Sequence, residues 1–235
     1  MLTTRGIIFR TTRFSESSLI VEVYTEAVGL CSFFMNGVYK KGSNRLPSLL
    51  QVANQIEFVS YYSESKDLHR IKEVSISKVY SRINQSLVHN AVATFILEIA
   101  KQCIKVKSKH QELYTYIEKV FIDLDEKEHL DPNFHLYFLI KFSYFFGFAP
   151  TEIASPRLNS FDLINGVFIE FNQTSNYSVL PEYSNFISDL IQMKSIKIDI
   201  QQRRNLLQIL LQYYQIHIEN FKQPQSPAIF KSVFF

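Results

Sequence analysis

The first 80 residues alternate apolar and polar side chains with a period of two, which is the pattern of strands buried on one face. β-Branched and aromatic residues are dense in these stretches, and polar turns such as residues 15–17 and 26–29 separate them. The pattern predicts five strands, at residues 6–10, 18–24, 30–38, 55–62 and 70–79. Five short strands favour a small barrel, and a helical turn predicted at 47–52 lies where an OB-type barrel has its inter-strand helix.

Near residue 81 the period changes to about 3.6, which predicts helices. Asp131 before Pro132 is a typical helix start, and Asp199 with Gln202 has the spacing of a capping box. The predicted fold class is therefore α+β, with a five-stranded OB-type barrel at residues 1–80, an all-helical domain at 81–235 and an irregular insert at about 150–181. Two apolar stripes indicate the first two helices: Val88, Val92, Phe95, Ile99 and Cys103, then Leu113, Ile117, Val120 and Leu124.

Composition is that of an ordinary globular protein, with 46% hydrophobic and 20% charged residues. The apolar run at 134–148 is interrupted by polar residues and is shorter than the roughly 20 residues of a membrane span, so it predicts a buried helix. The chain opens without the pattern of a secretion signal, so we expect a cytoplasmic protein. Cys31 and Cys103 are the only cysteines, and we expect neither a disulfide nor a metal or other cofactor.

Positive charge is concentrated in the N-terminal third. Residues 1–80 contain ten Lys and Arg against seven Asp and Glu, whereas residues 81–235 contain fifteen of each. Lys40, Lys41 and Arg45 lie in one loop after the third predicted strand, together with Gly42 and Ser43. Such a loop suits contact with a phosphate backbone, although three cations can also merely solvate a loop.

Several segments together resemble the RecO family of bacterial recombination mediators in DNA repair. They are GIIFR at 6–10, FSESSLI at 14–20, TEAVGL at 25–30, GVYKK at 37–41, YFFGFAP at 144–150 and FDL at 161–163. The resemblance implies an OB barrel followed by a helical domain, binding of single- and double-stranded DNA, strand annealing, and help in loading recombinase. It also implies association with the bacterial nucleoid, and RecR and the C-terminal tail of single-strand-binding protein as partners.

One departure from the family concerns zinc. Many members carry two CxxC pairs in the helical domain, and this chain has no cysteine around residues 161–168. A structural zinc is therefore not expected, and its loss requires compensating packing. We expect that packing from Phe161, Leu163, Phe168 and Phe171.

The candidate DNA contacts are Arg5, Arg10 and Arg13 along the first strand, Tyr39, and the loop cations Lys40, Lys41 and Arg45. Arg5 can instead pair with a carboxylate such as Glu22. Tyr39 is the favoured stacking residue because it adjoins the basic loop, whereas Phe33 is expected in the core. Further stacking candidates are Tyr24, Tyr61 and Tyr62. For the partner tail the candidates are Phe138, Lys141 and Phe142, for which internal packing is the alternative.

The sequence contains no recognisable pattern of catalytic residues. The six histidines include no pair at i, i+4 spacing, and there is no GxSxG, P-loop or GxGxxG motif. We therefore expect a binding protein and not an enzyme. The alternative from another class is a protein-interaction scaffold whose basic loop is incidental, and a salt titration of DNA binding separates the two.

Overall fold

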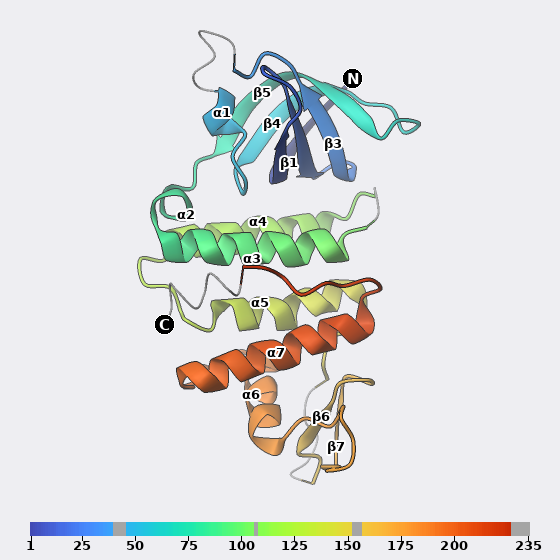
Figure 1. Ribbon diagram of the computed structural model, residues 1–235, viewed down its shortest axis with the longest axis vertical. Helices are drawn as coiled ribbons and strands as arrows, with labels where there is room; N and C mark the ends of the chain where they lie inside the picture. Colours follow the sequence, from blue (N-terminus) through green and yellow to red (C-terminus); the bar gives the residue numbers. More distant parts are fainter. Residues whose placement is uncertain (40–45, 106–107, 152–156, 227–235) are drawn as a thin grey trace. The chain divides into compact units, whose positions relative to one another are not determined.

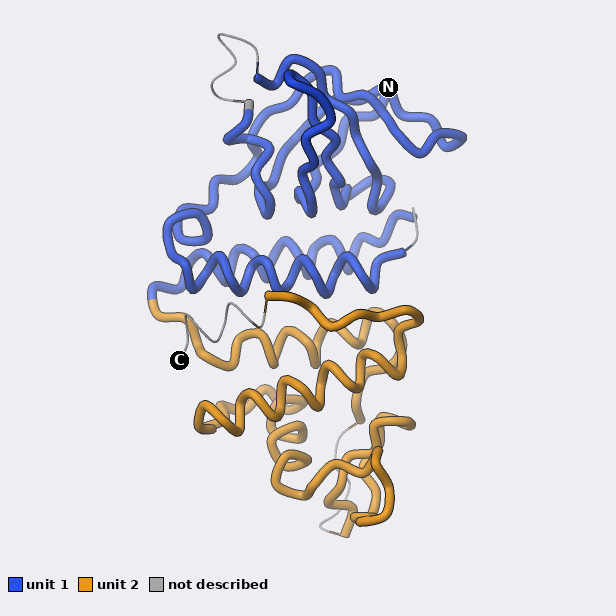
Figure 2. Tube along the Cα trace, viewed as in Figure 1, with its two compact units in different colours: residues 1–128 blue, residues 129–235 orange. Residues whose placement is uncertain are grey.

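The computed structural model describes residues 1–39, 46–105, 108–151 and 157–226. The chain forms two compact units, residues 1–128 and 129–235 (Figure 2), and each is described by itself.

Unit 1 begins with a closed five-stranded barrel in the order β1-β2-β3-β5-β4 (Figure 1). Every neighbouring pair is antiparallel except β3 and β5, which are parallel. A short helix precedes β4, close to the predicted helical turn, and the predicted OB-type barrel is confirmed. The elements are β1 Leu2–Arg13, β2 Leu19–Thr25, β3 Gly29–Met35, α1 Leu46–Leu49, β4 Gln55–Tyr61 and β5 Leu68–Lys78.

The barrel interior is filled by the inward-facing side chains of all five strands, as the alternation predicts. Phe33 is fully buried and meets the ring of Phe58 edge-on at 4.8 Å between centroids, so its expected core role is confirmed. Gly6 allows close packing there, because a Cβ at this position would lie 2.4 Å from Cγ1 of Val23. These contacts fix which residues of each strand face outward.

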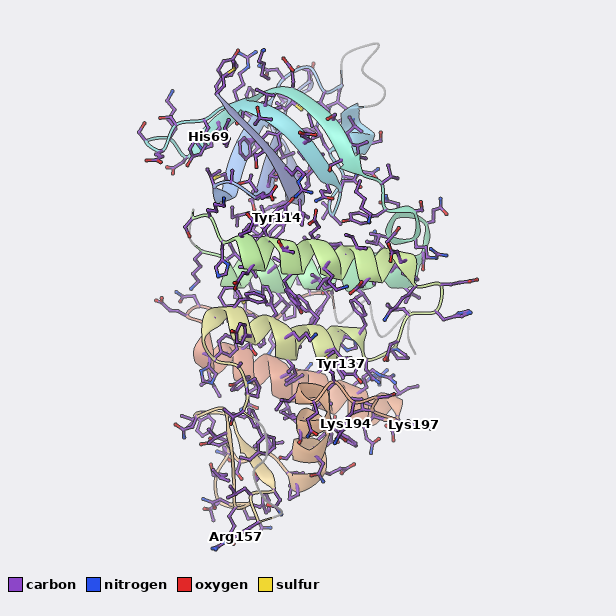
Figure 3. The ribbon with its side chains drawn as sticks, turned by 180° about the vertical axis from the view of Figure 1, so that it is seen from behind. His69, Tyr114, Tyr137, Arg157, Lys194 and Lys197 are labelled. Atoms are coloured by element: carbon purple, nitrogen blue, oxygen red, sulfur yellow. The ribbon has the colours of Figure 1, made fainter. Side chains whose placement is uncertain are left out.

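Among the described residues of unit 1, three helices follow the barrel: α2 Ser81–Gln85, α3 Leu87–Cys103 and α4 Gln111–Glu126. The side chain of Ser86 accepts a hydrogen bond from the amide of His89 and caps α3. Tyr114 of α4 lies on the side of the helix that faces the barrel, and its ring centroid is 5.9 Å from that of Tyr24 (Figure 3). Tyr24 is thereby buried between the barrel and α4, which removes it from the candidate stacking residues.

That residues 1–80 fold as a separate barrel stays a prediction. It can be tested because Tyr24 of the barrel packs on α4, which lies outside this segment. A fragment of residues 1–80 would expose Phe9 and Tyr24, which are buried in the whole chain. We expect a fragment of residues 1–128 to unfold at a higher temperature than the 1–80 fragment, by at least several degrees. Thermal circular dichroism of both fragments measures this. Equal melting temperatures would show that the barrel needs no helix to cover it.

The described residues of unit 2 form four helical segments and one short two-stranded hairpin, so the predicted fold class of a barrel followed by a helical domain is confirmed. The hairpin occupies the predicted irregular insert, and the insert ends where α6 begins, at Pro181. The capping box is confirmed: Asp199 and Gln202 cap the helix reciprocally. The elements are α5 Phe134–Ser143, the 3₁₀ turn η1 Tyr144–Phe146, β6 Ser160–Asp162, β7 Val167–Ile169, α6 Pro181–Ile191 and α7 Ile200–His217.

The start of α5 also differs slightly from the prediction. The helix begins at Phe134, so Pro132 lies before it and not in its first turn. Asp131 still satisfies a backbone donor, because its Oδ1 accepts a hydrogen bond of 2.8 Å from the amide of Asn133. None of the described helices has the length and apolar character needed to cross a membrane.

A small apolar core holds the hairpin in place. Phe161, Leu163 and Phe168 are buried as expected, whereas Phe171 is partly exposed. The Phe161 ring lies 5.3 Å from the rings of both Phe168 and Tyr213. The backbone of Phe161 is also held by a side chain of α6, because its amide donates a hydrogen bond to Oγ of Ser184 at 2.8 Å. These contacts supply the packing that the absence of the zinc cysteines requires.

The absence of zinc therefore stays a prediction with direct physical support. We expect elemental analysis of protein purified without added metal to find much less than one zinc per chain, because thiolates are the usual ligands of structural zinc and both cysteines are buried thiols. A stoichiometric zinc content that survives dialysis against chelator would contradict this expectation.

Candidate nucleic-acid interface

Arg5 lies on the side of the barrel covered by α4, where carboxylates neutralise it. Its Nε and Nη2 each donate to a carboxylate oxygen of Glu26 at 3.1 Å, and Nη1 donates to Glu118 at 3.2 Å. The hydrogen bond between Arg5 and Glu26 raises the pKa of Arg5 and lowers that of Glu26. Arg5 is thus a poor candidate for a DNA contact, and its partners are not the expected Glu22, which pairs with Lys101 at 2.5 Å.

Arg10 and Arg13 lie on the exposed second half of β1. A register shift between Ile8 and Arg10 separates this half from the buried first half. Glu22 lies directly across from Arg10 on β2, but its carboxylate is engaged by Lys101. Among the described residues, Arg10 therefore has no carboxylate partner, and its charge is open to an anion.

Arg13 is held next to Tyr39. Its guanidinium carbon lies 5.1 Å from the centroid of the Tyr39 ring, a cation–π contact, and its nitrogens donate to the carbonyl oxygens of Ser15 and Glu16. These bonds leave the positive charge without a carboxylate. Tyr39 is 45% exposed, so ring and guanidinium both reach solvent.

Two hydrogen bonds fix the segment before Tyr39 to the turn between β1 and β2. The amide of Val38 donates to the carbonyl of Ser17 at 2.8 Å, and Oγ of Ser18 donates to Oδ1 of Asn36 at 3.0 Å. The predicted contacts Lys40, Lys41 and Arg45 lie outside the described residues. In the sequence, Lys40 and Lys41 come directly after Tyr39.

Sequence analysis missed three residues of this face. Phe14 is 64% exposed, and its ring meets that of Phe34 edge-on at 5.4 Å. Arg70 on β5 is the direct cross-strand partner of Phe34 on β3 and is also exposed. A basic residue in a strand has no sequence signal that shows which strand it will pair with, and the β3–β5 pair joins segments far apart in the chain.

Other stacking candidates divide between surface and core. Tyr61 at the end of β4 is 53% exposed. Tyr62 is partly buried, and its ring packs at 4.6 Å on that of His69, which points into the barrel from β5 (Figure 3). Tyr39 and Tyr61 are therefore the exposed tyrosines among the five aromatic candidates.

The candidate site for the partner tail, Phe138, Lys141 and Phe142 in unit 2, is more buried than a docking site requires. Phe138 and Phe142 are buried and stack on each other at 4.9 Å, and only Lys141 is exposed. Two buried rings cannot receive a partner side chain without opening the core, so this geometry favours the alternative of internal packing. The docking of a tail at these residues stays a prediction.

Within the described part of the chain, no group of three or more His, Cys, Asp or Glu side chains gathers closely enough to hold a metal ion. What the exposed barrel face offers instead is cations without carboxylate partners next to exposed aromatic rings. This combination binds nucleic-acid backbones and bases and requires no reacting group.

Comparison with known proteins gives two family matches. Residues 1–80 match the family model described as Recombination protein O N terminal, and residues 84–155 match Recombination protein O C terminal. Among solved structures, asparaginyl-tRNA synthetase of Entamoeba histolytica aligns over 66% of this chain and 34% of that chain, with 14% identity and a TM-score of 0.29, which is too low to carry an argument.

Curated relatives align over nearly the whole chain. A protein of Christiangramia forsetii named DNA repair protein RecO is 28% identical over 100% of this chain and 99% of the relative. The proteins of the same name from Flavobacterium psychrophilum and Phocaeicola vulgatus are 29% and 27% identical, each over 98% of this chain and 98% of the relative. Together with the OB-type barrel and the helices that follow it, these matches show that the chain belongs to the RecO family of DNA repair proteins.

Proposed function

We propose that this protein is a recombination mediator and strand-annealing factor that binds single- and double-stranded DNA through the exposed face of its barrel. The observation that carries the proposal is the group of Arg10, Arg13 and Tyr39: both guanidinium groups are exposed and have no carboxylate partner among the described residues, and that of Arg13 adjoins the exposed Tyr39 ring. Lys40, Lys41 and Arg45 follow immediately and add three cations to the same segment. Guanidinium and ammonium groups at such positions neutralise phosphates without regard to base sequence.

Annealing by this surface needs no chemistry. A protein that neutralises phosphates on two complementary strands lowers their mutual repulsion, and holding both raises their local concentration. Base pairing then supplies the free energy. This mechanism agrees with a family of repair mediators that is not a known class of enzyme.

Partner proteins belong to the same proposal. The family membership favours RecR and single-strand-binding protein as partners, the latter through its acidic and apolar C-terminal tail. Lys141 is the exposed candidate for that tail, and the neighbouring Phe138 and Phe142 would have to leave the core to join it. Bound to DNA, the protein would associate with the nucleoid.

The competing function is a protein-interaction scaffold. It differs from the proposal in its salt dependence, since release of counterions from DNA makes log K fall linearly with log salt. A scaffold whose cations are incidental would bind no DNA, or would bind it without this steep fall.

The double substitution Arg10→Ala and Arg13→Ala tests the proposal. We expect the salt slope for single-stranded DNA to flatten by about 1.4 units, or 0.7 for each lost phosphate contact. Fluorescence anisotropy of a labelled oligonucleotide over a range of salt concentrations measures the slope. A slope equal to that of the wild type, in a folded variant, would remove these residues from the interface.

Two controls separate local contacts from net charge. The double substitution Arg82→Ala and Lys119→Ala removes the same charge from α2 and α4 of the same unit, where Arg82 bonds a carbonyl and Lys119 pairs with Asp123. Arg5→Ala removes a cation that is already neutralised by Glu26 and Glu118. Both controls should leave the slope within about 0.3 units of the wild type, because neither removes a phosphate contact.

A further inference from the structure

The strand register brings a row of side chains together on the outer surface of the barrel. Phe34 on β3 lies directly across from Arg70 on β5, and Arg70 lies across from Tyr61 on β4. On β2, Ile20 is the partner of Phe34 and extends the row. We call Phe14, Phe34, Arg70 and Tyr61 the outer row.

The outer row faces away from the barrel core. Phe33 and His69, the neighbours of Phe34 and Arg70 in sequence, are buried with their rings 5.5 Å apart inside the barrel. Successive side chains of a strand point to opposite faces, so Phe34 and Arg70 point outward. Phe34 is partly exposed, while Phe14 and Tyr61 are mostly exposed, and the ring contact within the row is the edge-on pair of Phe14 and Phe34.

Charge in the outer row favours an anionic ligand. Among the described residues, Arg70 forms no ion pair, whereas the nearby Lys72 is paired with Glu73 at 2.8 Å. A guanidinium group between two aromatic side chains offers a phosphate contact between two stacking positions. Phe34 and Tyr61 are two strands apart, which is about 10 Å.

Exposed rings discriminate between the two forms of DNA. In a duplex the bases are paired and stacked on each other, and their faces are closed to a protein ring. In a single strand each base can stack on an aromatic side chain, with little preference for sequence. Phosphate contacts, by contrast, are available in both forms.

We propose that the outer row is a base-stacking platform specific for single-stranded nucleic acid, with Phe34, Tyr61 and Phe14 receiving bases and Arg70 contacting the backbone. This inference rests on the proposed function, since it names the part of the DNA-binding face that prefers single strands. Arg10 and Arg13 then bind phosphates of either form. The platform thereby explains how one barrel face holds a single strand until its complement arrives.

A tryptophan reporter tests the platform directly, because the protein contains no tryptophan. In Tyr61→Trp, fluorescence should be quenched by oligo(dT) and should stay unchanged with a hairpin duplex at the same degree of binding. Tyr144→Trp places the reporter on an exposed position of unit 2, where the tyrosine is 70% accessible, and should not respond to either DNA. Equal quenching of Tyr61→Trp by both DNA forms, or none by oligo(dT), would overturn the platform.

Affinity measurements provide a second test of the platform. Tyr61→Ala and Phe14→Ala should each weaken binding of single strands about tenfold and leave duplex binding and the salt slope unchanged, because the lost interaction is stacking. Tyr61→Phe keeps the ring and should bind as the wild type. Unchanged single-strand affinity in both alanine variants, in a wild type that binds DNA with a steep salt slope, would refute the platform alone. A wild type that binds no DNA would refute the proposed function itself.

Discussion

Replacing Lys40, Lys41 and Arg45 together with alanine should weaken DNA binding about 100-fold at 0.1 M salt. Each lost single-strand phosphate contact flattens the salt slope by about 0.7, so three contacts remove about two units, and the lines for variant and wild type converge near 1 M salt. The loss should be similar for every DNA sequence, because phosphates carry no base information. Anisotropy titrations at several salt concentrations, with two unrelated oligonucleotides, measure both quantities.

Folding provides the control for this triple variant. Substitutions at surface loop positions usually change stability by less than about 0.5 kcal/mol, so thermal unfolding should match that of the wild type. Wild-type affinity and slope in a folded triple variant would mean that these three cations only solvate the loop. The DNA surface would then have to depend on Arg10 and Arg13.

Phe161→Ala should lower the stability of unit 2 by about 3–5 kcal/mol, because it opens a cavity where a buried ring now packs. Phe161 is fully buried and contacts the rings of Phe168 and Tyr213. In urea unfolding followed by circular dichroism, the transition of unit 2 should move to lower denaturant by more than about 1 M. This is the packing that we expect to stabilise this part of the fold without a metal.

Ile164→Ala is the matched control, since Ile164 lies in the turn that follows β6 and is 48% exposed. It should change the stability by less than about 0.5 kcal/mol. A loss of under 1 kcal/mol for Phe161→Ala would show that the apolar core of the hairpin contributes little, and that something else holds this part of the chain.

The barrel was predictable because its signal is local. Alternation locates the strands, and the residues of one strand that alternate inward, such as Val21 and Val23, need no knowledge of distant partners. The capping box of Asp199 and Gln202 is likewise a local pattern, because it involves only four consecutive residues. Where a local pattern decides the structure, sequence analysis and structure agree.

Partners distant in the chain were not predictable. Arg5 pairs with Glu118, which is 113 positions away, and no pattern around Arg5 indicates that choice. The outer row depends on the pairing of β3 with β5, which skips β4 in the sequence.

The most direct test of the account is the binding of wild-type protein to a single-stranded oligonucleotide as a function of salt. Six candidate cations, Arg10, Arg13, Lys40, Lys41, Arg45 and Arg70, would each contribute about 0.7 to the slope, so the account predicts a slope of about −4.2 in log K against log salt. Titrations between 50 and 400 mM salt, roughly a tenfold range, are sufficient to define it. Absent binding, or a slope flatter than about −1, would contradict a DNA-binding barrel and favour the protein-interaction scaffold.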